Sequence, residues 1–178
     1  MNQVIFYYLN SLAGKSVCFD SLVVFSAQYL PYLLALGFIL ILICSKYDKV
    51  LKIKIFLFST LSVFLSRIVM TEIIRFFYFV PRPFVNNAVH QLIFHETSGS
   101  FPSGHAAFFF ALAMAIYFFH KKWSIVFFIG AILISVARVI AGIHWLIDIF
   151  WGAIIGILSA WLVYKIFQKI YNPVRNGE

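Results

Sequence analysis

Long apolar segments are the feature that most limits how this chain can fold. Five of them follow one another, separated by short polar connections, and we expect helices at residues 22–44, 55–80, 102–119, 123–140 and 144–171. A helix needs about 20 residues to cross the roughly 30 Å hydrocarbon core of a bilayer. The sequence therefore predicts an all-α, polytopic membrane helical bundle with about five transmembrane helices.

The composition agrees with a membrane protein. Hydrophobic residues make up 63% of the chain, against about half in a soluble domain. Residues 1–14 are apolar but too short to cross a bilayer, so we expect an N-terminal interfacial helix there. Pro31 is tolerable inside the first span because a neighbouring helix can satisfy the carbonyl that it leaves unbonded. Since no repeat divides the chain, we expect one membrane-embedded domain over residues 1–178.

The basic residues predict the orientation of the bundle. The net charge of +8 would suggest a nucleic-acid partner in a soluble protein, but here the charges lie in membrane loops, so we expect none. Short cytoplasmic loops are enriched in lysine and arginine. Nine of the 14 basic residues fall in or beside connections on one side: Lys46, Lys49, Lys52, Lys54, Lys121, Lys122, Lys165, Lys169 and Arg175. The N-terminus, the 84–101 loop and the 141–143 turn are therefore predicted to face outward.

Three polar residues interrupt the apolar sequence near this outer turn. Arg138 precedes it, and His144 and Asp148 follow it. An arginine or aspartate at the centre of a membrane helix costs about 2.5–3.5 kcal/mol on insertion scales, so such residues are functional candidates. If His144 and Asp148 are four residues apart on one helix, the carboxylate can hold one ring nitrogen and leave the other free as a nucleophile.

Two earlier segments should reach the same depth. Arg75 and Arg82 lie at the outer end of the second span, and guanidinium groups suit phosphate oxygens. Ser103 and His105 lie at the outer start of the third span, within Pro-Ser-Gly-His. The proline and the small pair Ser103-Gly104 suit a helix start, where free amide groups bind anions, and the Ser103 hydroxyl adds another donor. Together these residues predict a phosphate site at one membrane face.

The chain resembles the type-2 phosphatidic acid phosphatase superfamily, which includes the vanadium haloperoxidases. The resemblance rests on three motifs, in the order that the family has: Arg75-x6-Arg82-Pro83, Pro102-Ser103-Gly104-His105 and Arg138-x5-His144-x3-Asp148. Two positions depart from the family pattern. Arg75 stands where a lysine is usual, and Ala137 stands where a serine is usual.

The resemblance implies a metal-independent phosphatase that needs no cofactor. His144 would attack phosphorus and form a phosphohistidine, Asp148 would orient it, and His105 would protonate the leaving oxygen and later activate water. The phosphoryl oxygens would be held by a further group: Arg75, Arg82, Ser103, Gly104 and Arg138. Within the family, the chain is most similar to bacterial undecaprenyl-diphosphate phosphatases of cell-wall biogenesis, which implies a lipid phosphate substrate in a bacterial-type plasma membrane.

Several alternatives stay open at this stage. The substrate could be phosphatidylglycerophosphate, phosphatidate or a lipid A phosphate, and the enzyme could transfer the phosphoryl group to an acceptor other than water. A transporter is a further alternative, although it predicts charges spread through the membrane. Glu72 is expected to pair with Arg75, and Arg67 is expected to be structural. The two cysteines, Cys18 and Cys44, have no metal-type spacing, so no metal site is expected.

Overall fold

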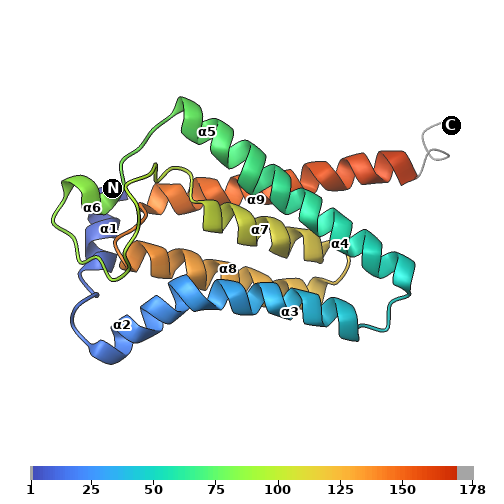
Figure 1. The fold of residues 1–178 in the computed structure, drawn as a ribbon, viewed down its shortest axis with the longest axis horizontal. Helices are drawn as coiled ribbons and strands as arrows, with labels where there is room; N and C mark the ends of the chain where they lie inside the picture. Colours follow the sequence, from blue (N-terminus) through green and yellow to red (C-terminus); the bar gives the residue numbers. More distant parts are fainter. Residues whose placement is uncertain (1, 172–178) are drawn as a thin grey trace.

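The computed structural model describes residues 2–171, and every regular element within them is helical. The predicted tail from Asn172, with Arg175, lies outside the described residues. The elements in chain order are α1 (Asn2–Asn10), α2 (Val17–Val24), the π-helical η1 (Phe25–Tyr29), α3 (Leu30–Cys44), α4 (Lys49–Val63), the π-helical η2 (Phe64–Met70), α5 (Thr71–Phe77), α6 (Pro83–Asn86), α7 (Gly104–Tyr117), α8 (Lys121–Ile140) and α9 (Leu146–Tyr171). The predicted all-α membrane bundle is confirmed (Figure 1).

Four helical segments within the described residues are long and apolar enough to cross a membrane: Val17–Cys44, Lys49–Phe77, Lys121–Ile140 and Leu146–Gln168. The predicted third span is shorter, because α7 has only 14 residues, or about 21 Å at 1.5 Å per residue. It packs against α9, α8 and α4 in the middle of the bundle (Figure 1). Since protein rather than lipid surrounds most of α7, its length need not match the thickness of the bilayer.

Small residues let α7 and α9 approach closely. α7 carries a stripe of alanines at residues 107, 111 and 115 that is completely buried. On α9, a Cβ atom added at Gly156 would lie 2.6 Å from the carbonyl oxygen of Ala107 and 2.8 Å from the amide nitrogen of Ala111. Both atoms belong to the backbone and cannot move aside. The small-residue stripes therefore hold the two helices in contact, as helix association in lipid requires.

We expect Gly156→Ala to lower the thermal unfolding midpoint of the detergent-purified protein. The added methyl group forces α7 and α9 apart, and overpacking of this kind costs about 1–3 kcal/mol. Gly37 of α3 provides the matched control, since a Cβ added there meets nothing within 4 Å. Gly37→Ala should leave the midpoint unchanged or raise it, because alanine is the better helix former. Equal midpoints for the two variants would contradict close α7–α9 packing.

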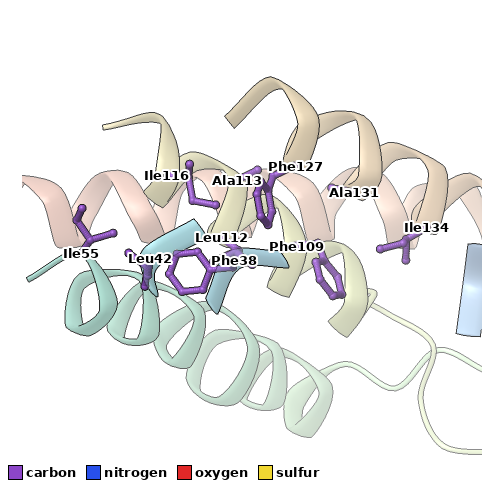
Figure 2. Close-up of a cluster of buried hydrophobic side chains, with 10 residues drawn as sticks. All are labelled: Phe38, Leu42, Ile55, Phe109, Leu112, Ala113, Ile116, Phe127, Ala131 and Ile134. Carbon is purple, nitrogen blue, oxygen red and sulfur yellow. The ribbon is translucent and has the colours of Figure 1, made fainter. Parts of the chain in front are cut away.

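A buried aromatic and aliphatic cluster joins four helices. It takes Phe38 and Leu42 from α3 and Ile55 from α4, and it packs them against side chains of α7 and α8 (Figure 2). The rings of Phe38 and Phe127 meet edge to face, with centroids 6.5 Å apart, a favourable geometry for aromatic pairs. This cluster fixes α3 and α4 against α7 and α8.

We call the end where α7 and α9 begin and α8 ends the site end of the bundle. The N-terminal helix α1 covers part of it. Phe6 is fully buried against the ring of Trp145. The Asn10 amide donates to the carbonyl oxygens of His90, at 2.8 Å, and Ile140, at 2.9 Å. α1 is therefore tied to both the 87–103 loop and the last residue of α8.

Candidate active site

His144 lies in the turn between α8 and α9, outside both helices. Gly142 makes this turn possible, because its φ of +76° is a conformation that side chains other than glycine rarely adopt. The predicted glycine turn is therefore confirmed, but the prediction that His144 begins the fifth helix is wrong. α9 begins only at Leu146. The histidine ring is almost completely buried.

Asp148 reaches back from the first turn of α9 to hold His144. Its Oδ2 accepts a hydrogen bond from the backbone amide of Trp145 at 2.8 Å, which is half of a capping box. The same oxygen lies 3.2 Å from Nδ1 of His144. The predicted His144–Asp148 contact is therefore present, but a helix cap makes it rather than a shared helix face. The carboxylate both starts the helix and fixes the ring.

Arg82 is buried beside the other nitrogen of this ring. Its Nη1 lies 3.2 Å from Nε2 of His144 and donates to the carbonyl oxygen of Ile143 at 2.9 Å. Its Nε donates to the carbonyl oxygen of Ser98 at 3.1 Å, and Nη2 to that of Gly99 at 3.3 Å. α5 ends at Phe77, so Arg82 reaches the site from the non-helical segment that follows this helix.

These contacts determine the tautomer of His144. A guanidinium group can only donate hydrogen bonds, so Nε2 accepts from Arg82 and Nδ1 carries the proton that Asp148 binds. Burial, and then the charges of Arg138 and Arg82, hold the pKa of His144 well below its usual value. Burial also lowers the pKa of Arg82 to about 10, which leaves it charged at neutral pH. The unprotonated Nε2 of His144 therefore faces the positively charged guanidinium group of Arg82.

The Pro-Ser-Gly-His segment joins this arrangement at the start of α7. The amide of Ser103 donates to the backbone carbonyl of Asp148 at 3.0 Å. The Ser103 hydroxyl caps α7 by accepting from the amide of Ala106 at 3.4 Å. Gly104 and His105 form the first turn of the helix. Among the described residues, no hydrogen-bond partner is found for the ring of His105, so both of its nitrogens are available for proton transfer.

Arg75 approaches the same segment from α5. Its Nη2 donates to the carbonyl oxygen of Pro102 at 3.0 Å. The expected ion pair with Glu72 is present, with Nη1 of Arg75 3.4 Å from the carboxylate. Nε of Arg75 is buried without a hydrogen-bond partner among the described residues. One edge of this guanidinium group is therefore free for an anion.

Arg138 has a structural contact in addition to its predicted role. Its Nη1 donates to the carbonyl oxygen of Ala27 at 3.2 Å. This carbonyl lies four residues before Pro31, which has no amide hydrogen to offer it. The neighbouring helix thus satisfies the group that Pro31 leaves unbonded, as the sequence predicted. The Nε atom of Arg138 is buried and has no partner among the described residues.

Sequence reasoning missed the part of the site built by the 87–103 loop. His95 of this loop is half-buried. Burial, and then the positive charge of Arg82, lower its pKa. Ser98 holds Arg82, and together with His95 it lines a cavity of about 510 Å³. No spacing in the sequence links this loop to Arg82, so no signal could have identified these contacts.

Comparison with known proteins identifies the family. The profile of the PAP2 superfamily matches residues 52–172. The chain is 29% identical to undecaprenyl-diphosphatase BcrC of Bacillus subtilis, over 97% of this chain and 87% of that protein. It is 28% identical to the bacitracin transport permease protein BcrC of Bacillus licheniformis, over 96% and 82% of the two chains. The crystal structure of Aquifex aeolicus LpxE superposes with a TM-score of 0.76 at 27% identity, covering 92% of this chain and 94% of that one.

The chain therefore belongs to the PAP2 superfamily, as its three motifs indicated. It is a multi-pass membrane protein and a hydrolase of the phosphatase class. Among the described residues, no group of three or more histidine, cysteine, aspartate or glutamate side chains is arranged to hold a metal ion.

Proposed function

We propose that this protein removes the terminal phosphate of an isoprenoid lipid diphosphate, converting undecaprenyl diphosphate to undecaprenyl phosphate through a phosphohistidine on His144. The observation that carries the proposal is the buried ring of His144. Asp148 holds its Nδ1, and Nε2 faces Arg82 at 3.2 Å. A nucleophile needs such an unprotonated nitrogen, and a phosphate oxygen is the natural ligand for the guanidinium group beside it.

The proposed reaction has two steps. Nε2 of His144 attacks the terminal phosphorus, the bond from phosphorus to the bridging oxygen breaks, and His105 gives its proton to that oxygen. Lipid monophosphate leaves. His105 then takes a proton from water, whose oxygen attacks the phosphohistidine and releases inorganic phosphate and His144. Each step transfers one phosphoryl group, and the enzyme returns to its starting protonation state.

Positive charge and amide groups would take the part that a metal ion takes in many phosphoryl-transfer enzymes. We assign the phosphoryl oxygens to Arg75, Arg82 and Arg138, together with the Ser103 hydroxyl and the Gly104 amide at the start of α7. The unbonded Nε atoms of Arg75 and Arg138 support this assignment. For Arg82, phosphate would replace the contact with Nε2 of His144. We therefore propose catalysis without a metal or another cofactor.

The lipid substrate is supported by the position of the site in the bundle and by the Bacillus subtilis relative. A head group can reach the site end while the lipid tail stays among the bilayer chains. A relative that is similar over 97% of this chain is named an undecaprenyl-diphosphatase. Phosphatidylglycerophosphate, phosphatidate and lipid A are alternative substrates that share the phosphate monoester or anhydride chemistry. A transferase would use the same phosphohistidine with another acceptor.

The lysine distribution supports an outward-facing site in a plasma membrane of bacterial type. Lys46 in the α3–α4 connection, the lysines in the first turns of α4 and those at the start of α8 lie at the end of the bundle opposite the site. This distribution would make that end cytoplasmic. A transporter is less well supported. Within residues 2–168, the buried charged side chains, namely Arg82, Arg138 and Asp148, all belong to the site end.

We also propose that the chain forms one membrane domain.

Lipid hydrolysis by the purified protein tests the function. In excess chelator, we expect release of inorganic phosphate from undecaprenyl diphosphate at a kcat/KM at least about tenfold above that for phosphatidate or phosphatidylglycerophosphate, a difference of about 1.4 kcal/mol. Turnover that disappears in chelator and returns with a divalent metal would contradict the metal-free mechanism. Equal or greater activity on the other lipids would contradict the substrate.

A further inference from the structure

Arg67, Glu72 and Arg75 form a charged cluster on η2 and α5 that the proposed mechanism uses only in part. One carboxylate oxygen, Oε1 of Glu72, accepts from Nη1 of Arg67 and lies 3.4 Å from Nη1 of Arg75. Two guanidinium groups thus converge on a single anionic oxygen. With two positive charges and one negative charge, the cluster keeps a net positive charge, which favours the binding of a further anion.

The π-helix η2 explains how Arg67 reaches this position. Residues five apart, such as Arg67 and Glu72, point about 140° away from each other in a regular α-helix at 100° per residue. A π-helix bonds residue i to i+5 and brings such residues to one face. η2 is held in place by the hydroxyl of Ser66, which donates to the carbonyl oxygen of Ala107 at 2.8 Å. The hydroxyl of Thr71 donates to the carbonyl oxygen of Ser66 at 2.9 Å.

Arg67 lies against the first residue of α7. A Cβ atom added at Gly104 would lie only 2.5 Å from Nε of Arg67 and 2.9 Å from its Cζ. Arg67 therefore borders the amide groups that we assign to the transferred phosphate, although it belongs to none of the three motifs.

The cluster opens away from the protein core. The side chain of Glu72 is 50% exposed and that of Arg67 is 31% exposed, whereas Arg82 and His144 are almost completely buried. α5 extends away from the other helices (Figure 1), and its Phe76 and Phe77 are exposed. An apolar exposed surface of this kind in a membrane helix faces lipid. The cluster is thus partly open on the surface of a membrane helix, whereas the histidine is enclosed.

We propose that Arg67 and Nη1 of Arg75 form a second anion subsite, which binds the lipid-attached phosphate of a diphosphate substrate at the place that the Glu72 carboxylate takes in this structure. The unbonded Nε of Arg75 stays assigned to the transferred phosphoryl group. The inference rests on the proposed function, because only a diphosphate has a second phosphate. When His144 bonds to the terminal phosphorus and the bridging bond breaks, the lipid-attached phosphate becomes the leaving group. Arg67 then stabilises its negative charge, and it makes the enzyme prefer diphosphates over monophosphates.

Two substrates with one tail test the subsite. We measure kcat/KM for a C15 isoprenyl diphosphate and the C15 isoprenyl monophosphate, using the full-length protein in detergent. Arg67→Gln should lower kcat/KM for the diphosphate about 30-fold, which is the effect of losing one charge-assisted hydrogen bond. The same variant should lower kcat/KM for the monophosphate by less than about threefold. Arg67→Lys should recover part of the loss. Lys122→Gln, which removes a positive charge from α8 at the opposite end, should change neither value.

Glu72→Gln gives an independent readout. It removes the competing charge with little change in shape, so we expect a lower KM for the diphosphate and an unchanged KM for the monophosphate. An equal loss on both substrates in Arg67→Gln, or an unchanged diphosphate KM in Glu72→Gln, would overturn the subsite. If the unaltered protein itself does not prefer the diphosphate, the proposed function fails, and the subsite fails with it. If it does prefer the diphosphate but Arg67→Gln keeps that preference, only the subsite fails.

Discussion

His144→Ala is expected to lower the rate of phosphate release from the lipid by about 10⁴-fold or more, the scale found when an enzyme loses its nucleophile. The change removes the only atom that we propose to bond to phosphorus. Arg82 and Asp148 remain in the variant, but they cannot form the phosphohistidine intermediate without the ring of His144. Initial rates of inorganic phosphate release by the purified variant measure the effect.

The control for this variant is another histidine that caps a helix. His120 lies at the opposite end of the bundle, and its Nδ1 accepts from the amide of Trp123 at 3.3 Å. His120→Ala should keep the full rate even if the lost cap lowers the unfolding midpoint. Near-normal turnover by His144→Ala would refute the proposed chemistry. Because His144 is buried, its variant must also retain a cooperative melting transition for a loss of rate to count.

Asp148→Asn is expected to lower kcat by about 10³–10⁴-fold, by analogy with the loss of the aspartate in serine-protease triads, with little change in KM. The amide side chain can donate to Nδ1 of His144, which favours the tautomer that carries its proton on Nε2. The nucleophilic electron pair is then lost while the ring stays in place. Because the same oxygen, Oδ2, contacts both Nδ1 of His144 and the Trp145 amide, an amide nitrogen in its place also loses the bond that starts α9. The variant must therefore keep a cooperative melting transition for a loss of kcat to count.

Asp48→Asn is the matched control for Asp148→Asn. Asp48 precedes α4 at the opposite end of the bundle and makes no side-chain cap hydrogen bond. The same chemical change there should leave kcat unaltered. If Asp148→Asn raises KM and keeps kcat, Asp148 acts in substrate binding rather than in orienting His144, and the assigned role is wrong.

Much of the fold could be predicted because the membrane simplifies the problem. A span must be apolar and helical, so the five apolar segments were sufficient to identify the bundle. The length of α7 was overestimated, because hydropathy alone cannot distinguish a short helix surrounded by protein from a longer helix that meets lipid. Its start at Gly104 is decided by the cap that Ser103 provides, and that cap shortens the predicted 102–119 segment.

The candidate site was predicted as a set of residues but not as a geometry. Arg82 and Asp148, which the motifs named, both contact the ring of His144 in the structure. The i to i+4 spacing suggested a shared helix face, whereas the contact between His144 and Asp148 comes from a helix cap. The position of Arg67 depends on a π-helix, which has no sequence pattern. Contacts such as that of Asn10 with Ile140, 130 residues apart, depend on packing alone.

The central claim is that His144 carries the phosphoryl group during turnover. The most direct test is to mix the protein with undecaprenyl diphosphate labelled with ³²P in the terminal phosphate, to stop the reaction in alkali within the first turnover, and to map the labelled peptide. A phosphohistidine survives alkali and is lost in acid. We predict acid-labile label on residue 144, and none in His144→Ala. Phosphate release without label at residue 144, or alkali-labile label on Ser103, would contradict the mechanism.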